Sequence, residues 1–372
     1  MSSTDRQARM GLCALAPLGA PAVVRAVEEF GPVDIWEGFR AQGPDTAWGR
    51  RAQAVDLTQL DRATHLCGSR FLTPGDEEWP APYAALAETT VSSQTGAPFG
   101  LWVRGRDLTA LTGGVAIVGS RACTTYGEHA ALTFAADLAA GGRTIISGLA
   151  FGIDAAAHRG ALGMRGTTVA VVASGVDVPY PRGNRALADA IVGRGAIISE
   201  LPPGYSPTRY AFLARNRLIA ALSAAVVIVE AAHRSGAKNT TSWGNALGIP
   251  VLAVPGPITS SLSATPHRLI RDAEATLVTS ADEVEAALAP LGTVPEPTGR
   301  GRDTPVDKLP PALFELREAV GGGETVGASQ LAARTGQSMI EVLSNAAELV
   351  EGGWLEENPD GTFRLPGRPI AS

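Results

Sequence analysis

The stretch Gly114-Val115-Ala116-Ile117-Val118-Gly119-Ser120-Arg121 decides the fold class of this chain. Four apolar, mostly β-branched residues between glycines predict a buried strand that ends in a small polar turn. Backbone amides at such a turn, and at the start of a following helix, can bind an anion, and Arg121 adds a guanidinium that can grip a phosphate with two hydrogen bonds. The spacing is not the Gly-x-Gly-x-x-Gly dinucleotide fingerprint, so this motif alone is weak evidence.

The same pattern of a short apolar strand and a helix-length segment repeats along the chain. The predicted strands are 115–118, 144–146, 168–172, 196–198, 225–229, 250–254 and 276–278. This alternation predicts an α/β fold with a doubly wound, mostly parallel sheet and helices on both faces. The loops that follow the strands are rich in Gly and Ser, and they share one sheet edge, where open α/β folds bind ligands. Because Gly and Ser are also ordinary turn formers, a single loop does not indicate a ligand site, and only the loops taken together do so.

Composition is typical of a globular protein that is not embedded in a membrane. The 372 residues are 45% hydrophobic, which supports at least one large core. The three cysteines, Cys13, Cys67 and Cys123, lack the spacing of a zinc site or of a disulfide framework, which favours the cytoplasm. Residues 6–16 superficially resemble a secretion signal, but prolines follow at once. We expect no membrane span, no metal and no cofactor.

Charge is distributed unevenly along the chain. The net charge is −6, yet residues 114–271 contain 13 Arg and one Lys against seven acids, a net charge of +7, which leaves −13 for the remainder. A basic centre between acidic flanks favours an anionic ligand, because a polyanion gains affinity by releasing its counterions. The alternative is the ordinary arginine usage of a GC-rich genome.

The two ends of the chain predict smaller domains. Helical patterns at 21–30, 34–39 and 56–64 indicate a small N-terminal helical domain over residues 1–70, and a turn-rich connector from residue 71 leads into the sheet domain, 71–290. Residues 291–307 have a linker composition. Helices at 310–320, 328–335 and 337–351 and a hairpin predict a winged-helix domain over 308–372. Its residues 308–366 hold four bases and nine acids, so contact with a protein is a better expectation than DNA reading.

Ordered blocks over some 150 residues resemble the DprA (Smf) DNA-processing protein family. The blocks are 118–121 with Tyr126-Gly127, 146–154 with Ala157-His158, 172–181 with Asn184, 198–200, 212–219 and 253–256. This resemblance implies an extended Rossmann-like fold that binds single-stranded DNA, forms a homodimer and helps load the RecA recombinase during natural transformation. It implies neither catalysis nor a metal.

A sequence-tolerant strand binder needs cations for phosphates and faces on which bases can stack. The expected DNA-binding residues are Gly119, Ser120, Arg121, Ser147, Gly148, Asn184, Phe212, Arg215, Asn216 and Arg217, with Lys238 as a further candidate. Arg121 and Arg217 are expected to line one phosphate-binding groove. Candidate stacking faces are Phe212, Tyr180 and Tyr210, although Phe212 can instead pack under its own helix.

The chain departs from the family pattern in the second half of this groove. Leu213 replaces a usual Pro, residues 235–241 replace a small aliphatic run, and Asp272 stands where Gly is commoner. Lys238 is either an added phosphate contact or an exposed residue of no consequence. Asp154 and His158 lie four residues apart on a predicted helix and are expected to form a local pair.

Two other functions stay open. A nucleotide-binding or nucleotide-cleaving protein related to lysine-decarboxylase-like phosphoribohydrolases would need a general acid or base, for which Glu200 is the candidate, and an ion pair with a groove arginine is its other role. The Pro-Gly-Gly-x-Gly-Thr loop of those enzymes is absent, since the chain has Pro255-Gly256-Pro257. The third possibility is an adaptor that acts only through the acidic C-terminal domain.

Overall fold

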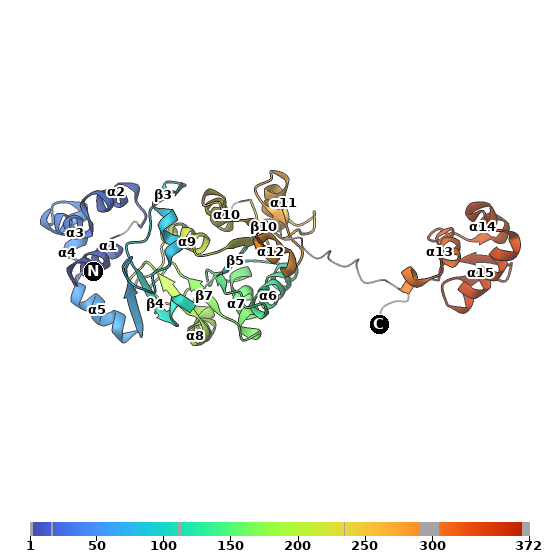
Figure 1. Ribbon diagram of the computed structural model, residues 1–372, viewed down its shortest axis with the longest axis horizontal. Helices are drawn as coiled ribbons and strands as arrows, with labels where there is room; N and C mark the ends of the chain where they lie inside the picture. The colour runs from blue at the N-terminus through green and yellow to red at the C-terminus, as the bar shows by residue number, and fades with distance from the viewer. Residues whose placement is uncertain (1–2, 16–17, 111–112, 234, 291–304, 367–372) are drawn as a thin grey trace. The chain divides into compact units, whose positions relative to one another are not determined.

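The computed structural model describes residues 3–15, 18–110, 113–233, 235–290 and 305–366. The chain divides into two compact units, Met1–Thr293 and Val294–Ser372 (Figure 1). The predicted linker at 291–307 lies outside the described residues except for its last three positions.

A nine-stranded sheet forms the centre of the larger unit, with the strand order β1-β4-β8-β7-β6-β5-β9-β10-β11. Its strands are β1 (Ser69–Leu72), β4 (Leu101–Gly105), β5 (Val115–Val118), β6 (Ile145–Ser147), β7 (Thr168–Val171), β8 (Ala196–Ser199), β9 (Ala225–Ile228), β10 (Val251–Ala253) and β11 (Thr276–Leu277). The seven strands from β8 to β11 in the sheet order are parallel. The predicted parallel sheet is therefore confirmed, and each predicted strand lies within one residue of the observed one.

Strand β1 was not expected, because residues from Phe71 onward have the composition of a connector. The structure pairs β1 antiparallel with β4 and places Phe71 opposite Trp102, with ring centroids 4.5 Å apart. Its residues, Ser69-Arg70-Phe71-Leu72, do not form a continuous apolar run like those of the predicted parallel strands, so its partner decides its conformation. A separate small hairpin joins β2 (Thr90–Val91) and β3 (Gln94–Thr95).

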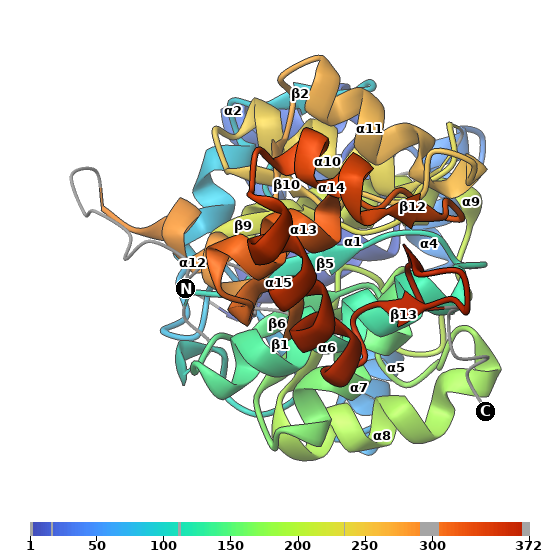
Figure 2. The same ribbon diagram turned by 90° about the vertical axis from the view of Figure 1, so that its right-hand side faces the viewer.

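Helices cover both faces of the sheet because alternate strand residues point to opposite sides. Val115 and Ile117 pack with α6 (Thr125–Ala140), α7 (Ile153–Gly163) and α12 (Ala281–Leu288). Ala116 and Val118 pack with α9 (Arg209–Ala221), α10 (Ala237–Ala246) and α11 (Ala264–Arg271). Figures 1 and 2 show α6, α7 and α8 (Arg185–Arg194) on one side of the sheet and α10 and α11 on the other.

Five helices precede the sheet. They are α1 (Ser3–Ala14), α2 (Pro21–Phe30), α3 (Pro32–Ala41), α4 (Ala47–Gln53) and α5 (Leu57–Leu66). The structure contains the three helices predicted here, as α2, α3 and α5, and adds α1 and α4. Met10 and Cys13 of α1 share a core with Trp102 of β4, so the boundary predicted at residue 70 falls inside one compact unit. Short 3-10 helices also occur at Ala81–Leu86, Leu108–Ala110, Arg182–Asn184 and Ser261–Ser263.

The smaller unit contains three helices and a small sheet. After a 3-10 turn at Pro305–Lys308, its elements are α13 (Pro311–Glu318), β12 (Val326–Gly327), α14 (Ala328–Thr335), α15 (Met339–Glu351), β13 (Glu356–Glu357) and β14 (Thr362–Arg364). The strands pair in the order β12-β14-β13. The helices and the hairpin lie where the sequence predicts them, and the winged-helix assignment stays a prediction.

Within the described ranges, no helix has the length and apolar character that crossing a membrane requires.

Candidate functional site

The loop after β5 is anchored to the loop after β9. The Ser120 amide donates to the Glu230 carbonyl at 2.6 Å, and the Glu230 carboxylate accepts from the Thr124 amide and hydroxyl at 2.8 and 2.7 Å. Gly127 leaves room for that carboxylate, since a Cβ there would overlap it. Glu230 thus fixes the loop that carries Arg121, a role that the sequence analysis did not assign.

Arg121 is exposed at the end of this loop and heads a row of stacked side chains. Its guanidinium carbon lies 4.6 Å from the centre of the Phe212 ring, and the Phe212 ring lies 5.5 Å from that of Tyr180. A cation over an aromatic face is stabilised by about 0.5–1 kcal/mol at an exposed site. The row joins residues that follow β5, β7 and β8 in sequence, and Tyr180 is 43% exposed. It offers a charge and an aromatic face side by side.

A pocket of about 420 Å³ opens beside this row. Six of the predicted DNA-binding residues line it: Gly119, Ser120, Arg121, Phe212, Arg215 and Asn216. The start of α10 also contributes to the wall. The first three amides of α10 donate within the turn that precedes the helix, so the positive charge of the pocket comes from Arg121 and Arg215. The structure therefore brings these six residues together, as expected for one binding site, although their contact with DNA stays a prediction.

Arg215 is the buried cation of this pocket, with 7% of its surface exposed. One of its terminal nitrogens donates to the carbonyl of Val171, and its guanidinium lies directly against Gly148, where a Cβ would overlap it. Burial lowers the pKa of Arg215 to about 10, and the nearby Asp154 opposes that shift. Arg215 therefore remains charged at neutral pH in a site partly shielded from water.

Asp154 and His158 do not form the expected local pair. The Asp154 carboxylate accepts from the amides of Gly148 and Ala150 at 3.1 and 3.3 Å, and burial raises its pKa although Arg215 favours its charged form. His158 Nδ1 lies 2.7 Å from the Thr168 hydroxyl, and burial lowers the pKa of His158 to about 3. Asp154 thus holds the loop after β6 through its backbone amides. His158 contacts Thr168 of β7 inside the core.

Arg217 does not line the pocket. The prediction that Arg121 and Arg217 line one phosphate-binding groove is therefore wrong. The Arg217 side chain is 1% exposed, and its two terminal nitrogens donate to Glu200 at 2.6 and 2.7 Å. The expectation that Glu200 forms an ion pair is confirmed, but its partner faces away from the groove. The Arg217 guanidinium lies close to Gly19 of the N-terminal segment.

Ser147 and Asn184 are also buried, with 0% and 2% exposure, so neither side chain reaches solvent as the prediction requires. The Ser147 hydroxyl donates to the Ile117 carbonyl at 2.7 Å. The Asn184 amide donates to the carbonyls of Leu149 and Ala150 at 3.0 and 3.2 Å. Both therefore shape the loop after β6 from beneath, since their polar groups satisfy backbone groups in the interior.

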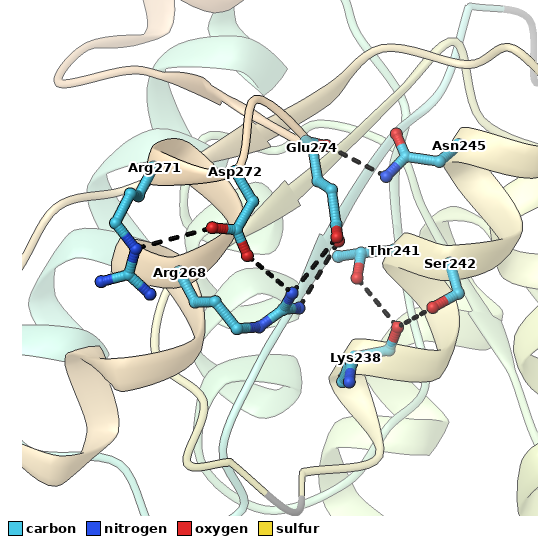
Figure 3. A network of polar contacts seen from close by, with 8 residues as sticks. All are labelled: Lys238, Thr241, Ser242, Asn245, Arg268, Arg271, Asp272 and Glu274. Carbon is cyan, nitrogen blue, oxygen red and sulfur yellow. Dashed lines mark hydrogen bonds and ion pairs between the residues drawn. The ribbon is translucent and has the colours of Figure 1, made fainter.

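Lys238 is exposed in the first turn of α10, and Figure 3 shows it with its polar neighbours. Its ammonium forms no ion pair among the described residues. On α11, by contrast, Arg268 pairs with Asp272 and Glu274 at 3.3 and 3.2 Å, and Arg271 pairs with Asp272 at 3.5 Å. Asp272, one of the departures from the family pattern, thus neutralises the cations of α11 and leaves Lys238 as a charge available to a ligand.

Two exposed residues that the sequence analysis did not nominate lie near the row. Phe151 is 50% exposed, and its ring lies beside Gly183, next to the exposed Arg182. Arg182 follows Tyr180 by two positions. Phe151 stands inside the block 146–154 that carries the resemblance, so a search of that block for aromatic residues would have found it, although exposure cannot be read from sequence. No group of His, Cys, Asp and Glu within the described residues could hold a metal ion.

The doubly wound, mostly parallel sheet, with a pocket among the loops at the carboxyl ends of its strands, defines an open α/β ligand-binding fold. Residues 70–289 match the model of the family described as DNA recombination-mediator protein A, and the chain belongs to this family. A Mycobacterium tuberculosis relative is 42% identical over 317 residues, which cover 84% of this chain and 80% of the relative. The Escherichia coli protein Smf is 37% identical over 321 residues, 85% of this chain and 82% of Smf.

Solved structures agree with this assignment. The X-ray structure of DNA processing protein A from Streptococcus pneumoniae superposes with a TM-score of 0.63 at 31% identity, over 77% of this chain and 98% of that protein. A structure of DNA processing protein A from Helicobacter pylori superposes with a TM-score of 0.51 at 27% identity, over 59% of this chain and 95% of that one. The Helicobacter structure concerns the single-stranded DNA binding mode of that protein.

Proposed function

We propose that this chain binds single-stranded DNA at the carboxyl edge of its central sheet and acts in DNA processing without catalysing a reaction. The row of Arg121, Phe212 and Tyr180 carries the proposal, because it places a cation and the exposed aromatic ring of Tyr180 along one surface. Base stacking contributes about 1–3 kcal/mol per base and tolerates any sequence. Arg121 and Lys238 would contact phosphates, and the pocket with Arg215 at its wall would take one phosphate out of bulk water.

Phe151 and Arg182 extend the proposed path along the same edge. Phe151 is a further stacking face, and Arg182 a further phosphate contact, because both are exposed near Tyr180. The proposal drops Arg217, Ser147 and Asn184 as direct contacts, and Gly148 acts by leaving space for Arg215. A strand that followed this path would cross the loops after β5, β6 and β7.

We further propose that the bound strand is passed to the RecA recombinase and that the protein works in the cytoplasm as a homodimer. The name of the family, DNA recombination-mediator protein A, supports a recombinase as partner. The homodimer rests on the family resemblance. A recombinase needs a protein-free strand. A strand held by separate contacts on an open surface is released more easily than one enclosed in a tunnel, which suits a mediator.

The nucleotide-cleaving alternative lacks its acid or base. Glu200 is 5% exposed and accepts two hydrogen bonds from Arg217, so it faces a fixed cation and does not line the pocket. Asp154 lines the pocket, but backbone amides already hold its carboxylate. These contacts favour binding over hydrolysis.

Fluorescence anisotropy over a salt series tests the proposal. We expect the full chain to bind a labelled poly-dT strand more tightly than a duplex of equal length, with an affinity that falls steeply as salt rises. Arg121→Ala should weaken binding equally for poly-dT and mixed-sequence strands and reduce the salt slope by about one. Arg194→Ala is the matched control, because Arg194 is exposed at the far end of α8, just before β8 begins.

Absence of strand binding at low salt would overturn the proposal and point to a small nucleotide ligand. Equal losses in Arg121→Ala and Arg194→Ala would show that the chain binds DNA through overall charge and not through this edge.

A further inference from the structure

An apolar stripe lies exposed on helix α15 of the smaller unit. Ile340 is 81% exposed, Leu343 51% and Met339 43%. Residues three and four positions apart share one side of a helix, so Ile340, Leu343 and the exposed Ala347 form a continuous stripe. A neighbouring side of α15 fills the core of the unit with Val342, Ala346 and Leu349. The helix is therefore apolar on two sides, although one side suffices for its own fold.

Helix α13 packs beside α15 and carries a further exposed aromatic residue. Figures 1 and 2 show α13 and α15 side by side, and the Gln337 side chain, just before α15, donates to the Ala312 carbonyl at 3.0 Å. Phe314 of α13 is 38% exposed. We call Met339, Ile340 and Leu343 the α15 face. Clustered large apolar side chains on a surface mark an interaction site more often than scattered ones do.

The charges around the α15 face are acidic. Within the described residues 305–366, each of the three arginines is paired with a glutamate: Arg317 with Glu318, Arg334 with Glu324, and Arg364 with Glu356. Exposed glutamates on the two helices, by contrast, have no ion-pair partner among the described residues: Glu315, Glu348 and Glu351. With four bases and nine acids over residues 308–366, the unit repels phosphates and also a second copy of itself.

We propose that the α15 face docks an amphipathic, basic segment of another protein, with apolar anchors on the stripe and Lys or Arg opposite the glutamates. Charge complementarity selects this occupant, because DNA and a second copy of the unit both bring negative charge. A helix laid across anchors at i, i+3 and i+4 spacing is an established mode of peptide recognition. The proposal does not depend on strand binding by the larger unit.

A labelled helical peptide with Leu at positions i, i+3, i+4 and i+7 and Lys on both sides of the Leu stripe provides the probe. We expect the full chain to bind it in anisotropy titrations and the double variant Ile340→Glu with Leu343→Glu to weaken binding by about tenfold or more, or about 1.4 kcal/mol. Met164→Glu is the matched control, because Met164 is 52% exposed at the end of α7 in the larger unit, away from the loops of the proposed strand path. Both changes add charge only at exposed positions, so far-UV circular dichroism should stay unchanged.

A peptide with Glu in place of Lys should bind much more weakly, and strand affinity should be equal in all these variants. Equal peptide binding by the double variant and the Met164→Glu variant would overturn the proposal. Loss of strand binding in the double variant would assign the α15 face to DNA instead. A dimer of the chain that only the double variant disrupts, in sedimentation velocity, would assign it to a second copy.

Discussion

Arg215 and Arg217 lie two residues apart on α9, and both are buried, but they serve different parts of the molecule. Arg215 lines the pocket at the carboxyl edge of the sheet, forms no ion pair with a described residue, and has the nearby Asp154 to favour its charged form. Arg217 faces the N-terminal segment and is held by both carboxylate oxygens of Glu200. The Arg215 guanidinium can therefore attract an anionic ligand, whereas the Arg217 guanidinium is neutralised by an internal ion pair.

Helix geometry explains the difference. Two residues separate side chains by about 200° around a helix axis, so they point to nearly opposite sides. The sequence Arg215-Asn216-Arg217 therefore cannot present both arginines to one groove once it forms a helix. The separation of the two arginines could be inferred from the sequence once a helix was assumed. The position of Glu200 beside Arg217 could not.

The largest expected effect comes from breaking the ion pair. Arg217→Ala leaves the carboxylate of Glu200 buried without a partner, which costs about 3–5 kcal/mol of unfolding free energy. Chemical denaturation measures this loss. The double variant Arg217→Met with Glu200→Leu should recover most of the stability, because no charge is then left buried.

Strand affinity of the folded Arg217→Ala protein should equal that of the wild type. Weakened strand binding with unchanged stability would contradict the assignment of the two arginines to different roles.

A moderate effect is expected on the other side of α9. Gly148→Ala places a methyl group where the guanidinium of Arg215 lies, so the arginine must leave its position. We expect strand affinity to fall about tenfold, equivalent to about 1.4 kcal/mol. Anisotropy titration provides the measurement. Gly163→Ala is the control, because nothing lies within 4 Å of a Cβ there.

Gly148→Ala should change strand affinity more than Gly163→Ala does. If both variants bind the strand like the wild type, Arg215 contributes nothing to strand affinity, and Arg215 and Arg217 do not differ in function.

The smallest effect is expected at the exposed rim. Lys238→Ala should weaken strand binding by about two- to threefold and reduce the salt slope by about one, because a phosphate contact in water is weak but releases a counterion. Lys308→Ala in the smaller unit is a matched removal of an exposed lysine and should leave the slope unchanged. A salt series on the two variants separates them, and identical slopes would remove Lys238 from the site.

The fold was largely predictable because its signal is local. Seven short apolar runs separated by helix-length segments give the parallel strands, and the helices of the smaller unit begin and end within two residues of their predicted bounds. Strand β1 and helices α1 and α4 were missed because each is short or atypical in pattern and is stabilised by contacts far along the chain, such as Phe71 with Trp102.

The candidate site was predictable only in part. Residues in loops at the carboxyl edge, such as Arg121, could be placed from the strand pattern, and Phe212 and Arg215 from the family resemblance. The burial of Ser147 and Asn184 depends on which carbonyls lie beneath the loop, and no local pattern encodes that.

The sequence by itself determined the parallel sheet, the edge at which its loops gather and the family to which the chain belongs, because strand periodicity and ordered motifs are properties of neighbouring residues. The tertiary structure decided which charges are available: it paired Arg217 with Glu200, neutralised Arg268 with Asp272 and Glu274, and brought Tyr180 and Phe212 beside Arg121. Ion pairs and stacking depend on distances between residues far apart in the chain, and only folding sets those distances.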